Sequence, residues 1–210
     1  MTQIEKIKYK PTPVRKILKE MKDLSEVMLD LAYSAALFND VELAEEVIDL
    51  EGHIDTLSYL LNMNAMIATR NAEDAEALIS IPTVAAAAND ISDAAADIAS
   101  LVLLGIGIHP IVREAFQQME ERLIKAVVKP ESPLINRKIG ELDLAAQLGV
   151  DIIAVKRGKR WIIDPKKNEK IREGDTIIAR GAPKGVETLR AITEAKGGRL
   201  SISSKEGPNG

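Results

Sequence analysis

Five carboxylates in the first half of the chain have the residue type and spacing to surround a metal ion. They are Glu51, Asp55, Asp90, Asp93 and Asp97. Steps of three and four residues bring side chains to one face of a helix, so Glu51 and Asp55 form one group and the three aspartates another. Carboxylate oxygens are hard ligands and suit Mg, Ca, Mn or Fe better than soft metals. We therefore predict a site for divalent or trivalent metal ions.

The charge of the surrounding stretch supports this prediction. Residues 23–112 hold sixteen Asp and Glu and one Arg, a net charge of -15, whereas the two flanks carry +5 and +6. Self-repulsion of this size destabilises a compact state. Either the carboxylates point into water as a solvated face, or cations that the sequence does not encode offset some of them.

Composition restricts the class of protein. The 210 residues are 46% hydrophobic and 29% charged, which is typical of a soluble globular protein, and the uneven charge favours two domains. The chain has no Cys, which excludes disulfides and thiolate metal sites and is compatible with a cytoplasmic location. The basic start of the chain does not resemble a secretory signal, and the most apolar stretch, Ile98 to Ile108, is too short to cross a membrane.

Heptad spacing predicts a bundle of long helices in the first half. One seam runs from Val14 to Phe38, with Thr12 as the expected N-cap residue, and a second runs from Leu43 to Leu61 after a cap at Asp40. A third helical segment starts at Ala72, is perturbed at Pro82, and continues along a seam. That seam is Val84, Ala88, Ile91, Ala95, Ile98 and Val102. Its three aspartates lie away from the seam, in a place that we expect to be partly enclosed. A shorter fourth helix runs from Pro110 to about Leu123.

Two motifs on these helices resemble those of the PhoU family. The segments E-G-H-I-D at Glu51 to Asp55 and N-D-I-S-D at Asn89 to Asp93 look like its paired E/D-x-x-x-D motifs, over about residues 13–125. Asn89 departs from the motif, which has a carboxylate there. The resemblance implies three-helix repeats that bind metal and regulate phosphate uptake. One repeat is present where the family has two, which implies a homodimer.

The second half has short β-rich runs separated by Gly and Pro, a pattern typical of a small mixed domain. The expected elements are, in order, a strand at Ala126 to Val128, a short helix stopped by Gly149, a hairpin at Gly158, a strand ending at Gly181 and a helix from Pro183 to Ala195. We predict an α plus α+β fold with a helical bundle over residues 1–125, a mixed domain over 126–196 and a flexible tail over 197–210.

The strands G-x-D-I-I-A-V-x-R-G and G-D-T-I-I-A-R-G, with S-P-L before them, resemble the TrkA C-terminal (RCK C-terminal) family over about residues 127–195. Members are regulatory modules of potassium channels and transporters. Some bind a small anion such as cyclic di-adenosine monophosphate, a cyclic dinucleotide, at a dimer interface. The resemblance implies a ligand pocket, for which Arg137, Arg157 and Asp164 are the candidates. The nucleotide-binding domain that usually precedes such modules has no counterpart in this sequence.

The basic residues of this half could meet an anionic ligand or simply form an exposed hairpin. Because Trp161 is the only aromatic residue near them, we expect no nucleic-acid partner. We also expect no enzyme activity, since no nucleophile with its base and no H-E-x-x-H spacing occurs. His53 lies beside the acidic motif and is either a metal contact or, more simply, a surface residue of its helix.

These features together predict a cytoplasmic, ligand-sensing regulatory protein that controls a membrane cation channel or transporter subunit, for potassium above all, without entering the membrane. Two alternatives stay open. One is a PhoU-like, metal-binding regulator of phosphate uptake, and the other is a structural dimeric adaptor without a ligand.

Overall fold

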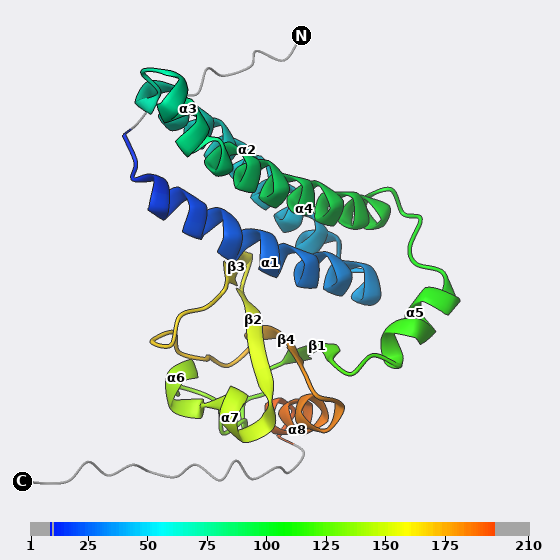
Figure 1. Ribbon diagram of the computed structural model, residues 1–210. Helices are drawn as coiled ribbons and strands as arrows, with labels where there is room; N and C mark the ends of the chain where they lie inside the picture. Colours follow the sequence, from blue (N-terminus) through cyan, green and yellow to red (C-terminus); the bar gives the residue numbers. More distant parts are fainter. Residues whose placement is uncertain (1–8, 10, 196–210) are drawn as a thin grey trace, which may run out of the picture. The chain divides into compact units, whose positions relative to one another are not determined.

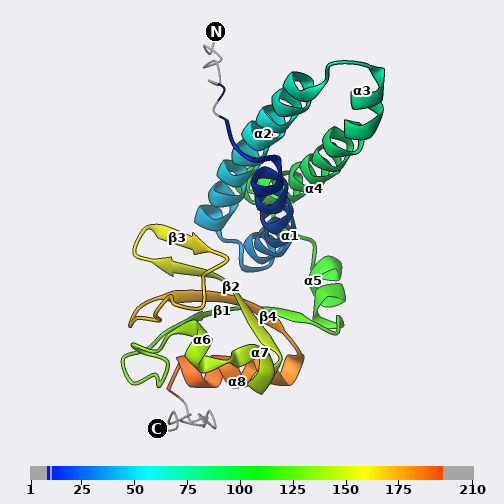
Figure 2. The ribbon, with the colours of Figure 1, turned by 60° about the vertical axis from the view of Figure 1, so that its left-hand side comes forward.

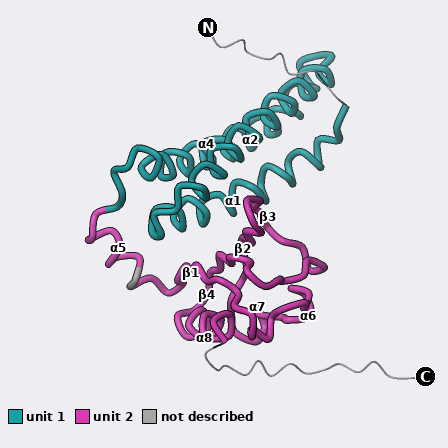
Figure 3. Tube along the Cα trace, turned by 180° about the vertical axis from the view of Figure 1, so that it is seen from behind, with its two compact units in different colours: residues 1–108 teal, residues 109–210 magenta. Residues whose placement is uncertain are grey.

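The computed structural model describes residue 9 and residues 11–195, which form two compact units, Met1–Ile108 and His109–Gly210 (Figure 3). The predicted fold class, a helical bundle followed by a small mixed domain, is confirmed. The first unit ends earlier than the predicted boundary at residue 125, and the predicted tail over residues 197–210 lies outside the described part of the chain.

The first unit is built from four helices: α1 (Val14–Phe38), α2 (Val41–Ala68), α3 (Ala72–Leu78) and α4 (Ser80–Leu103). The three long ones, α1, α2 and α4, each pack against the other two (Figure 1). The third helical segment is thus divided at Ile79, three residues before Pro82, as expected from a proline that can only be accommodated in a first turn.

The connection between α1 and α2 follows the prediction. Asn39 adopts the left-handed conformation at φ 50°, and Oδ1 of Asp40 accepts a hydrogen bond of 3.2 Å from the Leu43 amide. The start of α1 differs by one residue, because Pro13 rather than Thr12 occupies the N-cap position. A proline there has no amide hydrogen to leave unpaired, so the helix begins directly after it.

Of the six residues of the predicted seam, α4 buries only Ala95 and Val102. Its buried residues are mostly small: Ala85, Ser92, Ala95, Ala99 and Val102. Val84 and Ile91, which the seam placed inside, are 57% and 41% exposed. The distance between packed helices depends on the side chains at their contact, so small residues let α4 approach α1 and α2 closely. The larger residues are left outside.

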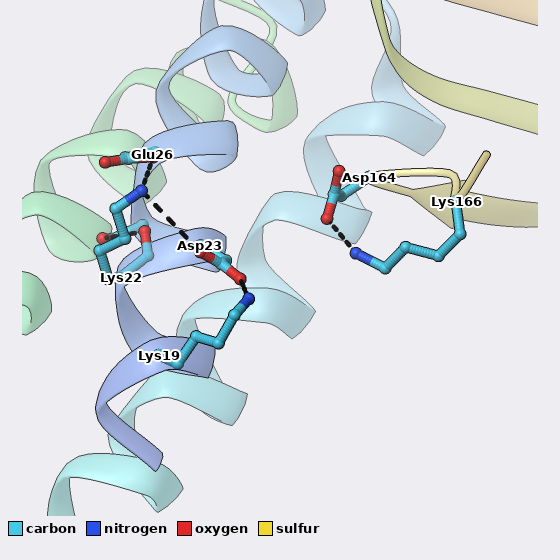
Figure 4. Close-up of polar contacts among 7 residues, drawn as sticks. Lys19, Lys22, Asp23, Glu26, Asp164 and Lys166 are labelled. Atoms are coloured by element: carbon cyan, nitrogen blue, oxygen red, sulfur yellow. Dashed lines mark hydrogen bonds and ion pairs between the residues drawn. The ribbon is translucent and has the colours of Figure 1, made fainter. Parts of the chain in front are cut away.

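Lysines of α1 neutralise part of the negative charge locally (Figure 4). Lys19 pairs with Asp23, and Lys22 pairs with Glu26 at 2.7 Å, each one helical turn apart. Such exposed pairs contribute little to stability. They do show that the basic flank compensates carboxylates of α1, whereas α4 contains three aspartates and no Lys or Arg.

The second unit consists of α5 (Pro110–Gln117), β1 (Arg122–Val127), α6 (Ile139–Leu142), α7 (Leu144–Leu148), β2 (Val150–Arg157), β3 (Arg160–Ile163), β4 (Thr176–Gly181) and α8 (Pro183–Thr193). The strands form one antiparallel sheet in the order β1-β4-β2-β3. The predicted fourth helix therefore ends earlier than Leu123, and the first strand begins before Ala126.

A hydrophobic core lies between the sheet and α7 and α8, which share one side of it (Figure 2). The predicted hairpin is present, with Arg157 opposite Arg160 and Gly158 at φ 62° in the turn. Gly185 of α8 lies so close to α7 that an added Cβ would sit 2.0 Å from the Leu148 carbonyl oxygen. Glycine is therefore required where these two helices meet.

Within the part of the chain that the structure describes, no helix is both long enough and apolar enough to span a membrane.

The packing of α4 predicts a position-specific response to larger side chains. We expect Ala99→Leu, at a fully buried position, to destabilise the protein by about 1–3 kcal/mol because the interior has no room for it. Ala86→Leu, at an exposed position of the same helix, is the matched control and should be nearly neutral. Urea denaturation of both variants checks this, and equal effects would contradict the packing described.

Candidate functional site

Three of the five predicted metal-binding carboxylates lie together at the surface of the first unit. Glu51 and Asp55 come from successive turns of α2, and Asp93 comes from α4. One carboxylate oxygen of each lies within 4.8 Å of the other two. Glu51 is half-buried, and the two aspartates are exposed. We call these three residues the acidic cluster.

The environment of Glu51 disfavours its negative charge. Partial burial removes water from the carboxylate and raises the pKa of Glu51, and the nearby charges of Asp55 and Asp93 raise it further. Among the residues that the structure describes, no positive side chain offsets these effects at Glu51. A bound cation would reverse this effect, because it favours the ionised form.

Asn89 supports the cluster from one turn before Asp93. Its Nδ2 lies 3.4 and 3.5 Å from the two carboxylate oxygens of Asp93, which are long donor distances. Its Oδ1 is buried and has no hydrogen-bond partner among the described residues. Asn89, where the resemblance led us to expect a carboxylate, thus adds an amide rather than a further negative charge.

Asp90 and Asp97 lie outside the acidic cluster. Both are exposed on α4, so the expectation that the aspartates of this helix are enclosed is wrong. The reason is the burial of the other face of α4, which turns both side chains toward water. His53, the other predicted contact, lies with Nε2 2.9 Å from Oε1 of Glu20 on α1.

The dimensions of the acidic cluster fit a hard cation. Oxygens on opposite sides of one ion are about 4.2 Å apart around Mg²⁺ and up to roughly 5 Å apart around Ca²⁺. The three carboxylate oxygens all lie within 4.8 Å of one another, which is inside the span across Ca²⁺, whereas Mg²⁺ would need them somewhat closer together. Three ligands would leave further coordination positions for water, as both ions commonly have. At this site an ion would neutralise charge between α2 and α4.

In the second unit, two segments that are distant in sequence run side by side. The amide of Asn136 donates to Ile171, and the amides of Ile139 and Gly140 donate to Glu169 and Lys167, all at 2.8–2.9 Å. Between them, Lys138 forms an antiparallel bridge with Lys170. The pairing collects four basic residues, which we call the cationic ladder: Arg137, Lys138, Lys167 and Lys170.

Gly140 allows the two segments to meet. A Cβ at this position would lie 2.9 Å from Cβ of Lys167 and 3.0 Å from its carbonyl oxygen. Any larger residue would therefore push the 167–171 segment away. The cationic ladder depends on this close approach.

Arg157 holds the same segment in place through its hydrogen bonds. It donates from Nε and Nη2 to the carboxylate of Asp175 at 3.0 and 2.9 Å, from Nη1 to Glu169 at 2.8 Å, and from Nη2 to the Lys170 carbonyl at 2.7 Å. These bonds, Asp175 first, raise the pKa of Arg157 above its usual value. Four of its five N–H groups are thus bonded within the chain, and through them Arg157 positions the ladder.

The other two predicted ligand residues have different surroundings. Arg137 belongs to the cationic ladder and is 37% exposed, with Nε 3.7 Å from a carboxylate oxygen of Glu141. Asp164 is exposed and pairs with Lys166 (Figure 4). Lys167 and Lys170 stand out in the sequence as part of a basic run, but nothing there shows that they lie beside Arg137 and Lys138, because the pairing that joins them is not local.

Comparison with family models identifies both units. The model described as PhoU domain matches residues 18–102, and the model described as TrkA-C domain matches residues 123–193. The chain joins a PhoU domain to a TrkA-C domain. The acidic cluster lies in the PhoU domain, and the cationic ladder lies in the TrkA-C domain.

Solved structures similar to the chain include two RCK_C domains. The RCK_C domain dimer of S. agalactiae BusR in complex with c-di-AMP is 23% identical over 35% of this chain and 96% of its own, with a TM-score of 0.33. The RCK C domain of the potassium transport protein KtrA, also in complex with c-di-AMP, is 27% identical over 39% and 93%, with a TM-score of 0.32. The domain assignment rests on the family models.

A third structure corrects one expectation. S. agalactiae BusR in complex with its busAB-promoter DNA matches 84% of this chain and 96% of its own, with 16% identity and a TM-score of 0.33. The exclusion of a nucleic-acid partner, which rested on the scarcity of aromatic residues, is therefore wrong. Aromatic stacking serves single strands, whereas binding to duplex DNA depends on Lys and Arg contacts to phosphates.

The raised pKa of Glu51 predicts a pH-dependent effect of its removal. A group whose pKa is higher in the folded state favours folding below its unfolded value of 4.5 and loses that contribution as the pH rises through its folded value. Without divalent ions, Glu51→Gln should therefore stabilise the protein at pH 7, by about 0.5 kcal/mol or less because water screens the site, and not at pH 4. Urea denaturation at both pH values measures this.

The matched control for this prediction is Asp90→Asn, which removes a negative charge from outside the cluster. It should change stability less than Glu51→Gln at pH 7. Equal gains for both variants would show that the overall charge, and not the cluster, is responsible.

Proposed function

We propose that this chain is a cytoplasmic, ligand-sensing regulatory protein of cation transport across a membrane, with potassium as the transported ion, and that it is not an enzyme. The observation that carries the proposal is the combination of a TrkA-C domain with a PhoU domain in one chain. The TrkA-C resemblance implies regulation of potassium channels and transporters. The proposed partner is a channel or transporter subunit, and the regulator acts as a homodimer.

The cationic ladder is the proposed ligand site. Four basic side chains on two paired segments attract a phosphate-bearing ligand, and Arg157 fixes the second segment through its bonds to Asp175 and Lys170. Lys167 and Lys170 are exposed and reachable from solvent. A small dianion such as a cyclic dinucleotide has the charge and the phosphate geometry for such a surface. Cyclic di-AMP is the probe of choice, because it is the ligand in the BusR and KtrA complexes.

The acidic cluster is the proposed cation site. It offers three hard oxygen ligands from two helices, and the carboxylate of Glu51 is disfavoured without a positive partner. A divalent ion such as Mg²⁺ or Mn²⁺ there would hold α2 and α4 together. Its proposed role is to stabilise the PhoU domain.

Ligand binding by the full chain tests the anion site. We expect cyclic di-AMP to bind in isothermal titration calorimetry, and Arg137→Ala to weaken binding at least about tenfold by removing a charge-assisted contact. Lys184→Ala, at an exposed position of α8, is the control and should bind as the natural chain does. Absence of binding to cyclic di-AMP would contradict this choice of ligand, and equal losses in both variants would contradict this site.

Metal binding tests the cation site. Mn²⁺ should bind to the natural chain, and Asp93→Asn should weaken binding by roughly tenfold or more because one of three charged ligands is lost. Asp97→Asn, one turn further along α4 and outside the cluster, should bind Mn²⁺ unchanged. Electron paramagnetic resonance of free Mn²⁺ gives both affinities, and equal affinity of Asp93→Asn and the natural chain would rule out the cluster.

A second candidate function is regulation of phosphate uptake, which the PhoU match over residues 18–102 favours. Uptake measurements in the source cell separate the two. Deletion of this chain should change the uptake of rubidium, a tracer for potassium, and leave the uptake of labelled phosphate unchanged. The opposite pattern would favour the phosphate regulator. No change in the uptake of rubidium or of phosphate would favour the structural adaptor.

A further inference from the structure

The end of the hairpin that α2, α3 and α4 form has no core of its own. No residue from Asn62 to Val84, all of which the structure describes, is buried, whereas Leu61 and Ala85 on either side of this stretch are completely buried. Four large apolar side chains in it are between 57% and 75% exposed: Met66, Ile67, Ile79 and Val84. We call these four residues the apolar tip. So much apolar surface within one short stretch marks a place where another molecule packs.

The fold brings the residues of the apolar tip to one end of the bundle. The acidic cluster fixes the level at which the antiparallel helices α2 and α4 lie side by side (Figure 2). Both helices rise equally per residue, so about 13 residues onward along α2 and about 13 back along α4 reach the same level. This count places Met66 and Ile67 level with Ile79. Val84 follows a little more than one turn later on α4.

The charge beside the apolar tip is negative. α3 contains Glu73, Asp74 and Glu76 and no basic residue. Arg70 pairs with Asp74 at 2.9 Å, whereas Glu73 and Glu76 are exposed and have no ion pair among the described residues. Steps of three residues bring Glu73, Glu76 and Ile79 to the same side of the helical path. Apolar and negatively charged groups therefore share one surface.

We propose that the apolar tip binds an amphipathic helix of a partner protein, with apolar residues on one side and Lys or Arg at its flanks. The flexible side chain of Met66 adapts to the shape of an incoming helix. Basic flanks pair with Glu73 and Glu76, and the apolar side covers the tip. The source of the helix rests on the function proposed above, because cytoplasmic segments of membrane proteins carry an excess of Lys and Arg.

The charges beside the tip disfavour two other occupants. A second copy of the chain would bring two sets of the Glu73 and Glu76 carboxylates to one interface, and like charges oppose association. The cytoplasmic surface of a membrane is negatively charged and would repel the same carboxylates. A basic helix is favoured by both the apolar and the charged groups.

Binding of model peptides to the full chain tests the chemistry of the partner. The probe is a labelled helical peptide of the repeat Leu-Lys-Lys-Leu-Leu-Lys-Leu, and its counterpart has Glu in place of every Lys. We expect the Lys peptide to bind at least about tenfold more tightly in fluorescence anisotropy, and added salt to weaken its binding. Equal affinity for the two peptides, or no binding of the Lys peptide, overturns the proposal.

Substitutions at exposed positions test the location of the surface. Met66→Ser combined with Ile79→Ser should weaken binding of the Lys peptide at least about tenfold. Val41→Ser, at a position 47% exposed at the other end of α2, is the control and should leave binding unchanged. Glu76→Lys should weaken binding of the Lys peptide and strengthen that of the Glu peptide, which a loss of folding could not do. Unchanged affinity of the double variant overturns the proposal.

Sedimentation and vesicle binding distinguish the other occupants. The double variant should have the oligomeric state of the natural chain, and neither protein should bind vesicles of phosphatidylglycerol. A changed oligomeric state would assign the apolar tip to a second copy. Vesicle binding that the double variant loses would assign it to a lipid surface. Either result overturns the proposal.

Rubidium uptake in the source cell separates this inference from the proposed function. The double variant should change uptake in the same direction as deletion of the chain. Binding of the Lys peptide at the tip, together with no effect of deletion on uptake, contradicts the proposed function alone. An effect of deletion that the double variant does not reproduce contradicts the inference alone.

Discussion

The close packing of small residues on α4 is the constraint on which the first unit depends. Ala95 and Ala99 are fully buried against α1 and α2, and no larger side chain fits there without moving a helix. This close packing also brings Asp93 of α4 within reach of Glu51 and Asp55 of α2. One packing choice thus determines both which face of α4 is buried and where carboxylates of two helices meet.

The second unit depends in a similar way on one buried ion pair. The carboxylate of Asp175 is 1% exposed and is bonded both to the guanidinium of Arg157 and to the Arg172 amide. A buried charge is tolerated only with such partners. These bonds fix the loop between β3 and β4, on which half of the cationic ladder lies. The PhoU domain therefore presents a cluster of carboxylates, and the TrkA-C domain presents a cluster of basic side chains.

The local features of the fold could be predicted from the sequence. The seams of α1 and α2, the cap at Asp40 and the turn at Gly158 follow from periodicity and from backbone preferences of single residues. The buried face of α4 could not be predicted in this way. A seam chosen by hydrophobicity selects Val84 and Ile91, whereas packing among three helices selects the alanines beside them.

The same distinction between local pattern and tertiary packing applies to the candidate sites. Spacing identified Glu51, Asp55 and Asp93, but it could not exclude Asp90 and Asp97, because the orientation of α4 about its axis decides which aspartates face α2. The cationic ladder needs the pairing of residues 136–140 with 167–171, which no local pattern predicts. Gly140, which a Cβ would drive into Lys167, was the one signal of a close approach there.

The central claim is that carboxylates of α2 and α4 form a cation site. A crystal of the full chain grown with Mn²⁺, measured for anomalous scattering, tests it most directly. We expect an anomalous peak in contact with oxygens of Glu51, Asp55 and Asp93. The three side chains pointing apart into solvent, with no peak between them at saturating Mn²⁺, would contradict it.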